Sequence, residues 1–371
     1  QERPIVFTSA LDAGVRDRGD WGGLVILGNA NVNQVDPAIE GITPAVTFGT
    51  TNNTAQDGES SGTLRYVRVE FAGIELTPNN ETNSITMGGV GRGTVMEYCM
   101  VSFGGDDGFE WFGGSVNGKY FVSFSTWDDC FDVDYGYSGN IQFGLSIRRP
   151  SFADQSGSNA FECDNGPNDN DVLPYTTGTF SNITAIGPIA PGFTSINANY
   201  QHAIDLRRRT AVSITNSVFI GWPRGLRMNQ PSVVGQYQAE RGILYNNVLV
   251  TPSGANQFIT ATGVALADIT KIWEDGGNTT ISGNPTNENV AALGLKNLYF
   301  VGAKSNTDFG SNPDFKIIAG TLNTASKFDK PKFQEANRMG FFQAVPYVGA
   351  FGQTADWTDG WAEFNPVAKA Y

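Results

Sequence analysis

The sequence predicts an all-β protein built as a parallel β-solenoid, and three observations indicate this fold. Short β-prone segments recur at a nearly constant spacing, Asn and Gly recur between them, and only 16% of the residues are charged. A repeat of about 20–30 residues made of short strands is typical of a solenoid, in which each coil pairs with the next about 4.8 Å away. The alternative is a sandwich or barrel of antiparallel strands, and the even spacing of the repeats argues against it.

The first repeated segment carries the inner and outer faces of the predicted coils. Residues 98–112 align with residues 120–134 at a fixed offset (131 − 109 = 22), and later copies follow. We expect the apolar residues of the repeat to stack in one inner column. The members of this column, in chain order, are Phe109, Phe131, Phe161, Ile204 and Leu226.

A second repeated segment begins with Asn, continues as a short apolar run and usually ends at Gly. Its copies start at Asn182, Asn216, Asn246 and Asn297. Asn and Gly accept left-handed backbone angles at low cost, so we expect them at the corners of the coils.

The chain is expected to form one continuous domain in two parts. Residues 1–254 are predicted to form the solenoid with an N-terminal cap. Residues 255–371 are predicted to form late coils with short helical insertions and a C-terminal capping segment, because residues 261–275 place apolar side chains at helical spacing. Further short helices are expected at 287–295 and 331–339. A cap is expected because open sheet edges pair with other chains.

The composition excludes several classes of partner. Lys and Arg number 24 against 37 Asp and Glu, a formal charge of −13, which argues against nucleic acid because phosphate binding needs clustered basic side chains. No apolar run reaches the roughly 18 residues of a membrane span. The sequence also lacks a phosphate-binding loop and a dinucleotide fingerprint, so no nucleotide cofactor is expected.

Four motifs of the chain are distinctive: Arg18-Gly19-Asp20-Trp21-Gly22-Gly23, Gly105-Asp106-Asp107-Gly108-Phe109-Glu110-Trp111, Trp127-Asp128-Asp129-Cys130-Phe131-Asp132 and Asp356-Trp357-Thr358-Asp359-Gly360-Trp361. They resemble motifs of a family of secreted or cell-surface proteins from Gram-negative bacteria of the Bacteroidota type. The resemblance implies a right-handed parallel β-helix outside the cell, without an assigned activity and without catalytic residues to transfer. The start at Gln1 without Met fits the same expectation of an exported, processed chain.

The predicted register stacks carboxylates as well as phenylalanines. Glu110, Asp132, Glu162 and Asp205 form one outer column, which Arg227 follows. Two carboxylates 4.8 Å apart repel by about 0.9 kcal/mol in water and by about 3.5 kcal/mol at an effective dielectric constant of 20. A cation, a shared proton, corner amides or neighbouring arginines must therefore compensate the column.

Hard oxygen ligands favour Ca²⁺, and two segments supply them. Asp132 and Asp134 lie in an Asp-x-Asp-x-Gly turn, and Asp164, Asp169 and Asp171 lie in an acidic loop. The alternative is a solvated acidic loop with amide-capped corners. Zinc is not expected because the chain has one His. The three Cys do not share a column, so we expect them to be buried free thiols and not disulfides.

These observations favour a structural or adhesive protein of the cell surface, stiffened by Ca²⁺ and capable of self-association or of binding a surface glycan. No catalysis is expected in this interpretation. The alternative is a polysaccharide lyase or glycoside hydrolase, whose acidic cleft is lined by Asp106, Asp107, Asp128, Asp129 and Arg207, with Trp111, Trp127 and Arg209 nearby. A third interpretation, passive glycan binding, uses Trp21, Trp111, Trp127 and Trp222.

Overall fold

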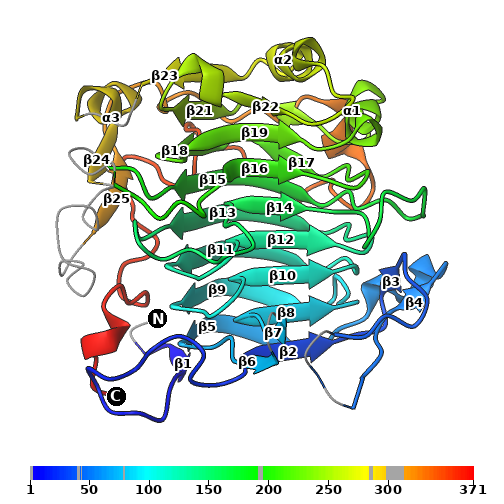
Figure 1. Cartoon of the computed structure of the whole chain (residues 1–371), viewed down its shortest axis with the longest axis vertical. Helices are drawn as coiled ribbons and strands as arrows, with labels where there is room; N and C mark the ends of the chain where they lie inside the picture. Colours follow the sequence, from blue (N-terminus) through cyan, green and yellow to red (C-terminus); the bar gives the residue numbers. More distant parts are fainter. Residues whose placement is uncertain are drawn as a thin grey trace.

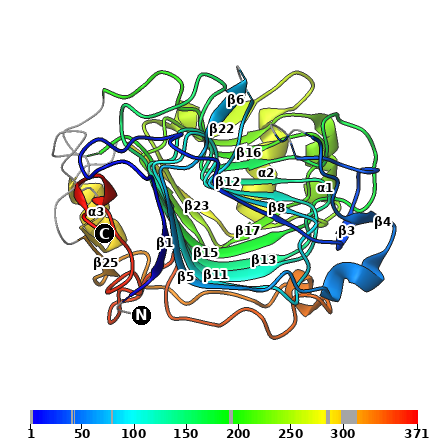
Figure 2. The ribbon, with the colours of Figure 1, turned by 90° about the horizontal axis from the view of Figure 1, so that it is seen from below.

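A computed structural model describes residues 3–39, 42, 44–77, 80–190, 195–283, 287–297 and 313–371 of the chain. Two long parallel sheets wind around a common core, with the strands of successive coils stacked along the long axis (Figure 1). The protein is an all-β right-handed parallel β-helix, which confirms the predicted fold class. The view along the axis shows the two sheets as opposite walls of each coil (Figure 2).

The two sheets hold most of the strands. Sheet A contains 11 strands: β1 (Ile5–Phe7), β5 (Thr63–Glu70), β9 (Val95–Ser102), β11 (Asn117–Phe124), β13 (Asn140–Ile147), β15 (Thr179–Ile186), β17 (Ser213–Thr215), β18 (Val218–Ile220), β20 (Leu244–Tyr245), β21 (Val248–Thr251) and β23 (Thr279–Ser282). Sheet B contains eight strands: β2 (Leu24–Leu27), β8 (Ile85–Gly88), β10 (Phe109–Phe112), β12 (Phe131–Asp134), β14 (Phe161–Cys163), β16 (His202–Leu206), β19 (Arg224–Met228) and β22 (Phe258–Thr260).

The remaining elements are small. Three two-stranded pairings are β3 (Asn31–Val32) with β4 (Thr50–Thr51), β6 (Glu75–Thr77) with β7 (Asn80–Glu81), and β24 (Leu295–Asn297) with β25 (Asp314–Ile317). The helices are α1 (Pro231–Gln238), α2 (Leu266–Asp275) and α3 (Asn287–Leu293), with 3₁₀ turns η1 (Thr54–Gly58), η2 (Gly254–Asn256), η3 (Pro331–Gln334) and η4 (Pro366–Ala368). Within the described ranges, every helix is too short or too polar to cross a bilayer.

The predicted inner column is confirmed in register. Phe109 pairs with Phe131, Phe131 with Phe161, Phe161 with Ile204, and Ile204 with Leu226, and all five side chains are buried. The ring centroids of Phe109 and Phe131 are 6.0 Å apart, and those of Phe131 and Phe161 are 5.0 Å apart. This column forms the sheet B side of the core, so residues one position along each strand must face outward.

Sheet A bends sharply along a second column, where one residue of each coil has a left-handed backbone. Asn182, Asn216 and Asn246 occupy this position with φ between 52° and 58°, which confirms the predicted role of Asn at corners. The earlier coils place Tyr66, Tyr98, Tyr120 and Phe143 at the same position, where φ is 55° to 66°. These rings stack, with 4.4 Å between the centroids of Tyr66 and Tyr98 and again between those of Tyr98 and Tyr120. Stacking offsets part of the cost that an aromatic residue bears at positive φ.

The C-terminal segment runs back along the outside of sheet A, toward the end where the chain begins (Figures 1 and 2). Its first contacts lie on a late coil, where the backbone of Lys327 bonds the side chain of Asn216. Farther down, Trp361 packs edge-on against Tyr98 with 5.9 Å between ring centroids, and the Tyr371 hydroxyl donates to Glu70. This segment therefore covers the aromatic column.

A helix covers the end of the solenoid, and it lies within residues 261–275, where the sequence predicted a helix. Helix α2 buries Ile269 and Trp273 against the core and packs on β22 and β20. The helix expected at 331–339 is wrong beyond Gln334, because the backbone becomes extended at Glu335 (ψ 142°) while Lys332 and Phe333 are buried. Helix α1 was not predicted, although Pro231 at its first turn is a usual start signal. Most of the fourth Asn-led segment, 297–302, lies outside the described residues.

Candidate functional site on the outer face of sheet B

The outer face of sheet B carries the predicted column of carboxylates. Glu110 pairs with Asp132, Asp132 with Glu162, Glu162 with Asp205, and Asp205 with Arg227. The strand period places these side chains outside because Phe109 and Trp111 point into the core. The predicted stacking of like charges is confirmed.

A second row of polar side chains lies where each coil enters sheet B. The Asp107 carboxylate accepts the backbone N–H of Asp129 at 2.7 Å, Asp129 accepts the backbone N–H of Asn159, and Asn159 accepts that of His202 at 2.9 Å. One oxygen of each side chain thus bonds the next coil. The second carboxylate oxygen of Asp129 accepts the side-chain N–H of Asn159 at 3.5 Å, so the amide-capped corners and the acidic column coexist.

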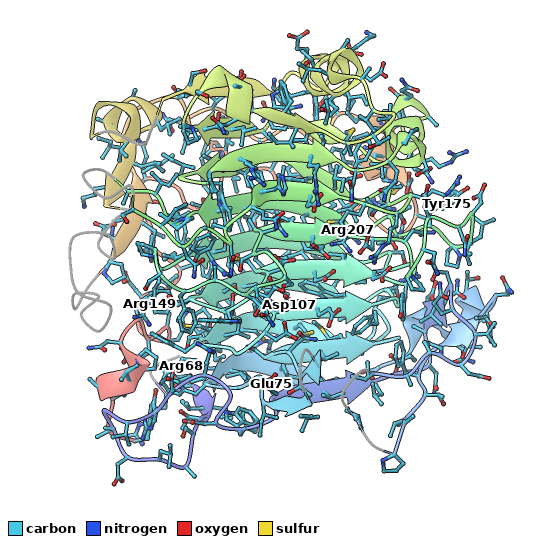
Figure 3. The ribbon with its side chains drawn as sticks, viewed as in Figure 1. Arg68, Glu75, Asp107, Arg149, Tyr175 and Arg207 are labelled. Carbon is cyan, nitrogen blue, oxygen red and sulfur yellow. The ribbon has the colours of Figure 1, made fainter. Side chains whose placement is uncertain are left out.

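The two rows converge in three carboxylate clusters. In each cluster the closest oxygens lie within 4.8 Å of one another, and the clusters are Asp106 with Asp107 and Asp128, Asp107 with Glu110 and Asp132, and Asp129 with Asp132 and Glu162. Asp107 and Asp132 each belong to two clusters, so seven carboxylates form a continuous acidic band. Figure 3 shows Asp107 on this face, with Arg207 several coils farther along.

The electrostatics of this band favour protonation or cation binding. Burial first, and then the neighbouring carboxylates, raise the pKa values of Asp107, Asp129 and Asp132 well above the usual range. Burial also raises the pKa of Asp128 to about 6 and that of Glu162 to about 8, although Arg207 opposes the shift of Glu162. Each shift measures the free energy by which the charged form is disfavoured, so a bound cation would be stabilising here.

Arginines balance the carboxylates on the later coils. Arg207 contacts Glu162 and lies 3.0 Å from Asp164, which also contacts Arg208 at 3.0 Å. Arg227 pairs with Asp205 through two nitrogen–oxygen contacts. The face is therefore electrically divided, with the acidic band on β10, β12 and β14 and ion pairs beyond it.

The five residues predicted to bind Ca²⁺ do not share one site. Asp132 belongs to two carboxylate clusters, whereas Asp134 accepts the N–H of Tyr135 at a corner, next to Asp164. Asp169 and Asp171 lie away from the band in an exposed loop. Arg209 lies 3.8 Å from Asp169 and 3.4 Å from Asp171. Its positive charge offsets theirs, so a bound cation would stabilise the loop less.

The residues of the predicted cleft also separate into groups. Asp106, Asp107 and Asp128 come together, and Asp129 joins the neighbouring cluster. Trp111 and Trp222 are completely buried in the core, so their expected contact with a glycan is wrong: both indoles stand at inward positions of the coil. Trp127 remains partly exposed at the edge of the band.

Two carboxylates of the clusters were not in the predicted metal set: Glu110 and Glu162, which the repeat had placed in the outer column. A third residue, Asn83, was missed because its offset from Asp107 is 24 and not 22 residues (107 − 83). The buried side chain of Asn83 donates to Glu110, and its Oδ1 has no hydrogen-bond partner within the described part of the chain. The alignment of 22-residue units could have found it by allowing an insertion.

The donor set fits Ca²⁺. Two oxygens bound at 2.3–2.6 Å to one Ca²⁺ are about 5 Å apart at most, and each cluster meets this limit. All donors are hard oxygens, and the orphaned Oδ1 atoms of Asn83 and Asp128 add neutral and charged oxygen at the edges. Asp132 would hold an ion together with Asp107 and Glu110, or together with Asp129 and Glu162.

The three cysteines take no part in this site. Cys99, Cys130 and Cys163 are buried and free, which confirms that prediction. Burial raises the pKa of Cys99 to about 12, so its thiolate is scarce at neutral pH. His202 is also buried, and burial lowers its pKa to about 4, which makes it a neutral side chain that holds Asn159.

The metal-free protein is expected to lose stability as the pH rises from about 4 to about 8. Asp128 and Glu162 bind their protons more tightly in the folded protein, so this contribution is complete below pH 4 and disappears as the pH passes the folded values of about 6 and 8. A shift of the size found for Asp128 corresponds to roughly 3 kcal/mol, or roughly 5 °C in Tm. Thermal unfolding in chelator across this pH range measures it, and a Tm that rises steadily from pH 4 to 8 would contradict it.

One comparison with known proteins is informative. A family model described as a pectate-lyase-like β-helix domain matches residues 1–294. No curated protein and no solved structure matches the chain significantly. The matched range contains both sheets and the whole acidic band.

Proposed function

Because the chain belongs to the family of pectate-lyase-like β-helix domains, we propose that it is an extracellular β-helix that binds Ca²⁺ on sheet B and holds a surface glycan there. The observation that carries this proposal is the acidic band, in which Asp107 and Asp132 each belong to two of the three clusters and so connect them. Ca²⁺ bound in the band would neutralise carboxylates from three coils and stiffen the solenoid. Its remaining coordination positions could take oxygens of a sugar.

The side chains of the band have distinct roles in this proposal. Asp132 is the central ligand because it faces both Glu110 and Glu162 across the coils. Asp107 and Asp129 anchor the next coil with one oxygen and offer the other to the ion. The corner hydrogen bonds therefore hold the ligands in place before an ion binds.

A second candidate, a polysaccharide lyase or hydrolase, is favoured by the family and by Arg207 at the rim of the band. The side chain of Arg207 is 19% exposed, so a substrate could touch it. However, Glu162 and Asp164 raise the pKa of Arg207 despite its burial, which disfavours Arg207 as a base that removes a proton. Binding without cleavage is therefore the function we prefer.

The proposal is tested by metal analysis followed by a glycan assay. We expect dialysed protein to retain or take up Ca²⁺, and to bind immobilised acidic polysaccharide with Ca²⁺ but not with chelator. The same mixtures are read for the absorbance of unsaturated sugar products. Product formation that disappears in Asp128→Asn would establish the lyase instead, and a protein that takes up no Ca²⁺ would overturn the proposed Ca²⁺ site.

A further inference from the structure

A pocket of about 630 Å³ lies next to the acidic band, outside the strands. Its walls come from segments that are distant in the sequence, among them the Arg18-Gly19 turn, Trp127, the loop at Asp154, and Asn197 with Asn199. Glu75, which Figure 3 shows on the same side of the molecule as Asp107, forms part of its rim. The proposed function uses none of these groups.

Arg18 is the unusual group of this pocket. Its Cζ atom lies 3.3 Å from the ring centroid of Trp127 and 5.4 Å from that of Phe152, so the guanidinium packs over the indole. In the part of the chain that the structure describes, this guanidinium makes no hydrogen bond and no ion pair. Burial lowers the pKa of Arg18, although Asp17, Asp154 and Glu75 oppose the shift. A half-buried guanidinium has five donors to satisfy, so an incoming acceptor would be favourable.

The floor of the pocket is fixed by hydrogen bonds. The Trp127 indole N–H donates to Asp154 Oδ1 at 2.6 Å, and the Ser156 N–H donates to Asp154 Oδ2 at 2.7 Å. The hydroxyl of Ser156 lies 2.6 Å from both Asp154 Oδ2 and Asp128 Oδ2. Asp154 is therefore already satisfied and does not compete for Arg18, and Ser156 links the pocket to the acidic band.

We propose that this pocket binds the anionic substituent of a sugar, a carboxylate or a sulfate ester, on the exposed edge of the Arg18 guanidinium. The inference rests on the proposed glycan-binding function. It adds the chemical class of the sugar substituent and the residue that binds it. Oxyanions match the planar fork of Arg, which can donate two parallel hydrogen bonds to them. Asn197 and Asn199 also line the pocket and supply polar groups that sugar hydroxyls can bond.

The position of Arg18, and not the overall charge of the pocket, favours an anion over a neutral sugar, because Glu75 and Asp154 also line the pocket. Arg18 is the one basic side chain among the described residues that line it. Its stacking on Trp127 holds the guanidinium in one orientation, which reduces the entropy lost on binding. Ca²⁺ bound in the adjacent acidic band would offset part of the negative charge on the same side.

The test is a titration of three tetrasaccharides: one of uronic acid, one carrying sulfate esters and one neutral. We expect at least one acidic ligand to bind the Ca²⁺-loaded protein at least tenfold more tightly than the neutral one. Arg18→Ala should lose about tenfold in affinity for that acidic ligand, and Arg18→Lys should lie between, because it keeps the charge without the fork. Arg65→Ala is the matched control, since Arg65 is an exposed arginine paired with Glu97 on sheet A.

The outcomes separate this inference from the proposed function. Equal affinity of the wild type for acidic and neutral ligands, or unchanged affinity in Arg18→Ala, would overturn the Arg18 site while Ca²⁺ binding stands. If Arg18→Ala unfolds, Arg18 is needed to hold the N-terminal segment in place. The affinity of Arg18→Lys for the acidic ligand then decides whether Arg18 also binds it. Loss of Ca²⁺ uptake in the wild type would overturn the proposed function, and titrations in chelator would still report on Arg18.

Discussion

Replacing Asp132 by Asn is expected to remove most of the stabilisation that Ca²⁺ gives to this protein. Asp132 belongs to two of the three carboxylate clusters, so one substitution weakens both. A ligand at 100 times its Kd stabilises the folded state by about 2.7 kcal/mol, and the variant should show less than about a third of this. In chelator at pH 8 the sign reverses: Asp132→Asn should be more stable than the wild type, because burial and its neighbours raise the pKa of Asp132 and so disfavour its charge.

Two control variants make this prediction specific. Glu97→Gln removes an exposed carboxylate on sheet A, paired with Arg65, and should leave the response to Ca²⁺ unchanged. Asp169→Asn tests the acidic loop, where Arg209 lies 3.8 Å away, and should also respond to Ca²⁺ like the wild type. Thermal unfolding with and without Ca²⁺ measures all three variants. If Asp169→Asn lost the response and Asp132→Asn kept it, the ion would lie in the loop and not on sheet B.

The fold was predictable because a solenoid repeats one local pattern. An offset of 22 residues between Phe109 and Phe131 already fixes which side chains stack, since parallel coils in register repeat every position. The same argument placed Glu110 over Asp132 and anticipated the left-handed Asn182 and Asn216. It did not anticipate Tyr66 or Tyr98 at that corner, because an isolated Tyr disfavours positive φ, and only the stack of neighbouring rings offsets the cost.

The site was less predictable because its partners come from distant segments. The loop at Asp169 contains as many acidic residues as a calcium loop, and only the position of Arg209, 40 residues later, shows that an arginine meets it. Similarly, Trp127 and Arg18 are more than 100 residues apart, and no repeat relates them. The C-terminal segment was expected to act as a cap, and its return along sheet A depends on aromatic contacts of Trp357 and Trp361 that have no counterpart within the repeat.

Replacing Phe131 by Ala should cost about 3–5 kcal/mol of unfolding free energy, a large part of the 5–15 kcal/mol typical of a folded domain. Phe131 is completely buried, and its ring centroid lies 6.0 Å from that of Phe109 and 5.0 Å from that of Phe161. The coils on both sides are tied by parallel backbone hydrogen bonds, so they cannot collapse into the cavity, and the cost should approach the upper end of the range. Urea unfolding measures the loss, with Phe7→Ala as the control because Phe7 is an aromatic residue of β1 that is 41% exposed. A loss in Phe131→Ala no larger than in Phe7→Ala would mean that the inner column does not hold the coils together.

The loss should be similar with Ca²⁺ and with chelator, because the core holds β12 in place from inside while the carboxylates face outward. A much larger loss with Ca²⁺ present would show instead that the packing of Phe131 positions Asp132, its neighbour on the same strand, for binding the ion.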